Sequence, residues 1–154
     1  MPQRDDHRLD TVAQIDGGTA SAAKHDFVSG LGADELIDYR AADFAANAGG
    51  VDVVLDTVGG ATARRSIGVL RPGGLQVTIV GRRDAGLAAR TEAAGRRFAG
   101  LGVEPDYPGL EALAGLAESG NLRMHLQATL DLAEAAKAHE LLESGITGKI
   151  ALTV

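Results

Sequence analysis

The residues best suited to chemistry lie where two apolar runs stop at glycine. The run Val51–Val58 (VDVVLDTV) is followed by Gly59–Gly60, and Leu75–Val80 (LQVTIV) is followed by Gly81. In open α/β sheets, ligands bind across the carboxyl ends of strands, and glycine there permits close approach to the backbone. Such glycines can equally serve only to turn the chain. The candidate cofactor-binding residues at these ends are Thr57, Val58, Gly59, Val80 and Gly81.

Other kinds of catalytic site have no support in the sequence, and no catalytic residue is assigned. There is no cysteine, which excludes disulfides and thiolate metal sites. No G-x-S-x-G pattern supports a hydrolase triad. Asp56 lies inside an apolar run, so we expect it to be structural rather than a general base. The histidines show no metal-ligand spacing: they are His7, His25, His125 and His139.

The charge and composition exclude several classes of partner. The net charge is −6 and the pI is about 5.1, whereas binding to nucleic acid needs concentrated Lys and Arg. No apolar run approaches the length of a membrane span, and the N-terminus (MPQRDDHRLD) is too polar for a secretory signal. We therefore expect a cytoplasmic protein with no nucleic-acid or membrane partner. The 21 glycines indicate many tight turns or close backbone approaches.

The elements that must position the candidate residues alternate between strand and helix. Near-continuous apolar character over 51–58 predicts a central parallel strand with both faces covered. Gly17–Gly18 are expected to break a short strand at Val12–Ile15. The alternation predicts an α/β fold with a Rossmann-like, mainly parallel sheet and helices on both faces. The other predicted strands are 35–39, 75–80, 98–103, 122–130 and 148–154, and the predicted helices are 22–31, 61–70, 88–97, 110–118 and 132–144.

The last predicted helix has a recognisable start and a predicted buried face. Asp131 and Glu134 form a capping box, in which Asp131 accepts from the third helical N–H while Glu134 reaches back. The residues that this helix is expected to bury are Ala135, Ala138, Leu141 and Leu142.

Four segments occur in a fixed order along the chain: TASAAKHDFVSGLGADELIDYR, VDVVLDTVGG, LRPGGLQVTIVG and LAEAAKAHELLESGITGKIALTV. Taken together, they resemble the medium-chain dehydrogenase/reductase superfamily, in particular its zinc-independent quinone oxidoreductase-like branch. The resemblance covers 19–154 and implies a Rossmann-like cofactor-binding domain over 19–130, after an atypical segment at 1–18. It also implies that the helix and strand of 131–154 return, in relatives, to the catalytic domain.

The same resemblance draws attention to parts that the sequence lacks. The family's catalytic domain is not found, and no G-x-G-x-x-G or relaxed equivalent precedes Thr19. Such a loop places backbone N–H groups on the pyrophosphate of a dinucleotide. We therefore expect a fold that is incomplete relative to the family, weakened or lost cofactor affinity, and a truncated chain that is inactive alone.

The resemblance also implies roles for Ser21, Lys24 and Tyr39, which match positions around the adenosine ribose and the 2′-phosphate of NADP. A hydroxyl and an ammonium group both donate hydrogen bonds to phosphate oxygens. No acidic residue occupies the position that binds ribose in NAD users, and Asp16 is the nearest candidate, so NADP is favoured and zinc is not expected. Alternatively, Lys24 is a solvated helix residue and Tyr39 covers the surface.

The leading hypothesis is thus an NADP-dependent reductase of the quinone or enone type. The alternatives are a non-catalytic binding or dimerisation module of this fold and, because VDVVLDTV and LRPGG also occur there, a methyltransferase-like domain. The expected partners are a nicotinamide dinucleotide, a second copy of the chain paired through an open strand edge, and a separate catalytic-domain polypeptide.

Overall fold

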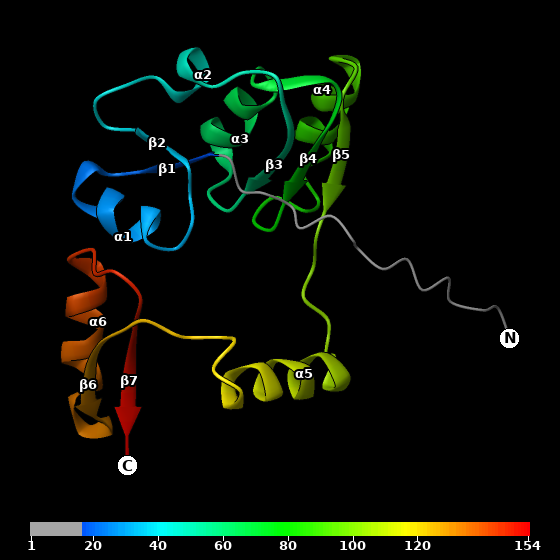
Figure 1. Ribbon diagram of the computed structural model, residues 1–154. Coiled ribbons are helices and arrows are strands. Elements are labelled where there is room, and N and C mark those ends of the chain that lie inside the picture. The colour runs from blue at the N-terminus through cyan, green and yellow to red at the C-terminus, as the bar shows by residue number, and fades with distance from the viewer. Residues whose placement is uncertain (1–16) are drawn as a thin grey trace, which may run out of the picture. The chain divides into compact units, whose positions relative to one another are not determined.

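The computed structural model describes residues 17–154, which fall into two compact units that divide between Gly102 and Val103 (Figure 1). The elements of the first unit are β1 (Gly17–Ala20), the 3-10 helix η1 (Ala22–Lys24), α1 (His25–Ser29), β2 (Glu35–Asp38), α2 (Phe44–Asn47), β3 (Val51–Asp56), α3 (Gly60–Ser66), β4 (Leu70–Thr78), α4 (Ala85–Ala93) and β5 (Arg97–Gly100). The second unit contains α5 (Tyr107–Glu118), β6 (Leu126–Asp131), the 3-10 helix η2 (Leu132–Glu134), α6 (Ala135–Glu143) and β7 (Lys149–Thr153). The alternation of strand and helix confirms the α/β class.

Every pair of strands in the described residues is parallel. β1 pairs with β2, β4 lies between β3 and β5, and β6 pairs with β7. Within 17–154, β3 pairs only with β4, so the central position predicted for 51–58 is not seen there, and the strand ends at Asp56 rather than at Val58. The β-branched residues of that run favour extended backbone, but they do not determine how many neighbours the strand has.

The core of the first unit lies between the three-stranded sheet and the helices α3 and α4. The amide nitrogen of Gln76, in β4, donates to the carbonyl of Ala63 in α3 at 2.7 Å, and the hydroxyl of Thr91 in α4 donates to the amide oxygen of Gln76 at 3.1 Å. Both helices therefore lie on the face of the sheet to which Gln76 points. On the other face, Val53 and Leu55 of β3 are 56% and 63% exposed.

The first strand does not follow the sequence prediction. The predicted strand Val12–Ile15 lies outside the described residues. The two glycines expected to break it instead lie within β1, where Gly17 pairs with Glu35 and Gly18 with Leu36. Pairing with β2 outweighs the low strand propensity of glycine here. In the described part of the chain, no helix combines the length and the apolar character required to cross a bilayer.

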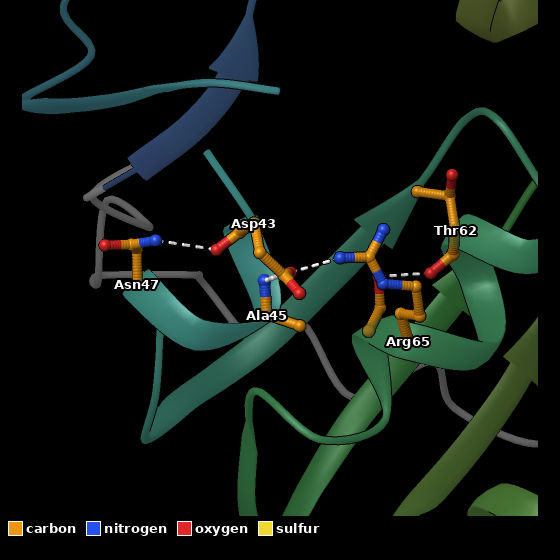
Figure 2. A network of polar contacts seen from close by, with 6 residues as sticks. Asp43, Ala45, Asn47, Thr62 and Arg65 are labelled. Atoms are coloured by element: carbon orange, nitrogen blue, oxygen red, sulfur yellow. Dashed lines mark hydrogen bonds and ion pairs between the residues drawn. The ribbon is translucent and has the colours of Figure 1, made fainter. Parts of the chain in front are cut away.

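The short helix α2 was not predicted, and Asp43 organises it (Figure 2). The Asp43 carboxylate accepts from the N–H of Ala45 at 2.8 Å, and the Asn47 side chain donates to the Asp43 carbonyl at 2.7 Å. The guanidinium of Arg65, in α3, bonds to the same carboxylate and lies 4.9 Å from the centre of the buried Phe44 ring. Asp43 thus caps α2 and also links it to α3.

The predicted capping box before α6 is only half formed. The Glu134 carboxylate accepts a hydrogen bond from the Asp131 backbone, whereas the Asp131 side chain makes no capping bond. A tighter 3-10 turn over Leu132–Glu134 replaces the first α-helical turn that the capping box requires. Of the residues predicted to be buried, Ala138 is buried, and Ala135 and Leu141 are half-buried. The prediction for Leu142 is wrong, because it is 46% exposed.

The ionisation of Glu134, at the start of this helix, can be tested. The Lys137 ammonium donates to the Glu134 carboxylate at 3.0 Å. That bond, the charge of Lys137 and the Asp131 backbone lower the pKa of Glu134 below its usual value. A depressed folded-state pKa gives stability that is present above the unfolded pKa and lost as pH falls through the folded one. We expect Lys137→Met to raise the pKa of Glu134 in an NMR titration and Lys149→Met to leave it unchanged; an unchanged pKa in Lys137→Met contradicts the assignment.

Candidate functional site

Two buried polar side chains stand at the carboxyl ends of β3 and β4. Asp56 and Thr78 are register partners on these neighbouring strands. Asp56 is 4% exposed and Thr78 is fully buried. The Thr78 hydroxyl donates to one carboxylate oxygen of Asp56 at 2.9 Å. Each side chain therefore satisfies part of the hydrogen-bonding capacity of the other inside the core.

Each of these side chains also holds the loop that follows its own strand. The second carboxylate oxygen of Asp56 accepts from the N–H groups of Val58 and Gly59 at 3.2 and 2.9 Å. The Thr78 hydroxyl oxygen accepts from the N–H groups of Val80 and Gly81 at 3.3 and 3.2 Å. The structure thus brings four of the predicted residues together on two adjacent loops.

Glycine is required at one point of this edge. Gly59 has φ +78°, and a Cβ added to it would lie 3.1 Å from a methyl carbon of Val80. A side chain at this position would therefore be strained in its backbone and would press against the Val80 side chain. Val58 and Val80 are 66% and 56% exposed, and Thr57 is also exposed. The edge consequently offers exposed valine side chains beside closely packed backbone.

The other predicted residues lie at the carboxyl ends of β1 and β2, whose last residues, Ala20 and Asp38, are register partners. Ser21 directly follows β1 and is buried, and its carbonyl accepts from the N–H of Lys24 at 2.8 Å. Lys24 is half-buried. Tyr39 directly follows β2 and is 52% exposed. These three residues therefore share one edge of the two-stranded sheet, with Tyr39 the most accessible.

Two residues of this edge, Asp56 and Thr78, have roles that were not fully predicted from the sequence. The structural role expected for Asp56 matches its contacts, but its hold on Val58 and Gly59 was not predicted. Thr78 was missed altogether. A signal was present, because Gln76 and Thr78 place polar side chains on one face of an otherwise apolar strand. Buried polar groups require partners, so this alternation predicts a hydrogen-bonded network.

The described residues show no metal centre. Within 17–154, no three His, Asp or Glu side chains gather closely enough to hold an ion. The ring nitrogen Nε2 of His25 lies 3.2 Å from the carbonyl of Ala20. Since a carbonyl only accepts, that nitrogen acts as the donor in this contact.

Three comparisons place this geometry among known proteins. A family model described as zinc-binding dehydrogenase matches residues 31–152. The spectinabilin polyketide synthase system protein NorB of Streptomyces orinoci is 37% identical over 149 residues, which cover 88% of this chain and 7% of that protein. The quinone oxidoreductase of Coxiella burnetii superposes with a TM-score of 0.81 at 32% identity, covering 90% of this chain and 44% of that one.

A further relative belongs to the phenolphthiocerol/phthiocerol polyketide synthase of Mycobacterium tuberculosis. This synthase protein is 29% identical over 161 residues, covering 92% of this chain and 7% of its own length. The chain therefore spans less than half the length of the solved quinone oxidoreductase and a small fraction of each synthase protein.

Proposed function

This chain belongs to the zinc-binding dehydrogenase family, and we propose that it forms the cofactor-binding part of a reductase that uses NADPH. The resemblance to the medium-chain dehydrogenase/reductase superfamily is confirmed by the family match and by the quinone oxidoreductase structure. The observation that carries the proposal is the pair of loops that Asp56 and Thr78 hold side by side. Ligands of open α/β sheets bind at such carboxyl ends.

In this proposal the two edges hold opposite ends of the dinucleotide. The exposed side chains of Val58 and Val80 contact the nicotinamide ring, and the closely packed loops around Gly59 and Gly81 orient it. When bound, the cofactor supplies a hydride, while the protein contributes orientation and a shaped surface. Ser21, Lys24 and Tyr39 hold the adenosine end, where the Lys24 ammonium pairs with the 2′-phosphate.

The proposed substrate class is an activated alkene or a quinone, in line with the quinone oxidoreductase likeness. A second candidate is a reductase portion of a polyketide synthase. The 37% identity to a stretch of the spectinabilin synthase protein favours it. Both candidates share the cofactor-binding part, and they differ in the substrate that the rest of the protein would bind. The family match does not favour the methyltransferase-like or the non-catalytic alternative.

The split between the two sheets of the first unit suggests what completes the site. In the described residues, β1 pairs only with β2, and β3 pairs only with β4. In a doubly wound sheet of order 3-2-1-4-5-6, one more parallel strand falls between these two sets. We propose that a strand from outside 17–154 lies there and brings the glycine-rich loop that anchors the pyrophosphate.

Three further expectations from the sequence stay predictions. They are that the chain alone is inactive, that it is cytoplasmic and that it forms a homodimer.

Titration of the purified chain with NADPH and NADH, followed by NMR, tests the proposal. We expect NADPH to bind more tightly, and Lys24→Ala to reduce the preference by about tenfold, because a hydrogen bond to a charged group contributes about 1.5 kcal/mol or more. Lys149→Ala, in the second unit, is the matched control and should keep the preference. Equal affinities of the wild-type chain for the two dinucleotides would contradict the proposal. S-adenosylmethionine should not bind.

A further inference from the structure

We propose that Asp56 and Thr78 are positioning residues that together fix the two ligand-facing loops, 57–59 and 79–81, before any ligand arrives. We call this pair the carboxyl-end clamp. The inference rests on the proposed function for the identity of the ligand. Its structural basis is independent of the ligand, because every contact of the clamp lies within the protein.

The clamp is a connected set of hydrogen bonds. One Asp56 oxygen accepts from two loop N–H groups, and the other accepts from the Thr78 hydroxyl at 2.9 Å. The oxygen of that same hydroxyl accepts from two N–H groups of the second loop. Neither loop is therefore fixed independently: the position of 79–81 is tied through Thr78 to Asp56, and so to 57–59.

Backbone bonds between neighbouring strands support this arrangement. The N–H of Ile79 donates to the Asp56 carbonyl at 3.1 Å, and the N–H of Leu101 donates to the Thr78 carbonyl at 2.9 Å. The strands thus stay paired up to the residues where the loops begin. Beyond the last hydrogen bond between the strands, the clamp provides acceptors for loop N–H groups that would otherwise depend on solvent.

The clamp also determines which backbone groups the loops present. Because the N–H groups of Val58, Gly59, Val80 and Gly81 are directed to Asp56 and Thr78, these two loops do not offer the successive amides that bind a phosphate group. Pre-formed loops lower the cost of ordering the site on binding. The consequence is a rigid, apolar edge rather than an anion-binding one.

Amide hydrogen exchange tests the clamp directly, with NADPH titration as a second readout. In the wild-type chain, the amides of Val58, Gly59, Val80 and Gly81 should be protected although they lie in loops. Thr78→Val keeps the side-chain shape but removes the hydroxyl, so it should speed exchange at Val80 and Gly81 most, and weaken NADPH binding, each by about tenfold. Thr78→Ser restores a hydroxyl and should restore both values toward wild type.

Thr91→Val is the matched control. Thr91 is as fully buried as Thr78 and lies on the same side of the sheet, but its hydroxyl bonds Gln76 and Leu87 rather than the loops. It should lower thermal stability without changing exchange at the four loop amides. If the four loop amides exchange without protection in the wild-type chain, the clamp is overturned, whether or not Thr78→Val folds. The clamp is also overturned if the loop amides exchange at the same rate in Thr78→Val and in Thr91→Val. If the exchange pattern is as expected but no dinucleotide binds, the clamp stands and the proposed function fails.

Discussion

Gly100→Ala should destabilise the first unit by about 3 kcal/mol, at the upper end of the usual cost of overpacking. Gly100 ends β5 and lies against the backbone that follows Gly81. A Cβ added to Gly100 would overlap the carbonyl oxygen of Arg82 and lie 2.7 Å from its Cα. These atoms belong to the main chain, so they cannot rotate away as a flexible side chain would. Relief of the overlap requires a shift of β5 or of the segment after β4.

Urea denaturation followed by circular dichroism measures this effect. The matched control is Gly49→Ala, also in the first unit, where an added Cβ meets nothing within 4 Å. That variant should be neutral or more stable by about 0.5 kcal/mol, through the reduced entropy of its unfolded chain. Because Arg82 directly follows the loop 79–81, Gly100→Ala should also weaken NADPH binding. Equal unfolding midpoints for Gly100→Ala and the wild type would contradict the close packing of these two segments.

Gln76→Leu should cost about 2 kcal/mol, within the range for leaving a buried polar group without a partner. Gln76 is fully buried and bonds one residue from each of the two helices that cover its face of the sheet. The Gln76 side chain donates to the carbonyl of Ala63 in α3 at 2.7 Å. Leucine fills a similar volume but cannot donate to that carbonyl.

The same denaturation experiment includes Gln127→Leu as its control. Gln127 is exposed in β6, so its replacement should change stability by no more than about 0.5 kcal/mol. Similar unfolding free energies for the two variants would show that the Gln76 network does not stabilise the first unit. A loss confined to Gln76→Leu supports the network as the link between α3, α4 and the sheet.

The class of fold, and the position of two candidate loops at the ends of neighbouring strands, could be predicted from the sequence. Glycines after β-branched runs located the loops at Gly59 and Gly81, and the loops meet because the carboxyl ends of neighbouring parallel strands lie together. The contacts of Ser21, Lys24 and Tyr39 with a ligand remain a prediction. The fold class and the loop positions were predictable because apolar runs that stop at glycine are typical of strand ends in α/β sheets.

The remaining features depend on pairing between distant segments, which local patterns do not specify. Gly17 and Gly18 were expected to break a strand, but pairing with Glu35 and Leu36 places them in one. β3 carries the apolar run of a central strand, yet within 17–154 it pairs on one side only. Thr78 was hidden inside an apolar run, and its importance follows only from the position of Asp56 on the neighbouring strand.

The most direct test of the account is a map of backbone amide shifts during titration of the ¹⁵N-labelled chain with NADPH. We expect the largest changes at Val58, Gly59, Val80 and Gly81, with a second set at Ser21, Lys24 and Tyr39. Residues 103–154, which form the other compact unit, should change little. Saturable changes confined to 103–154, or none at the carboxyl ends of β3 and β4, would contradict the proposed cofactor site.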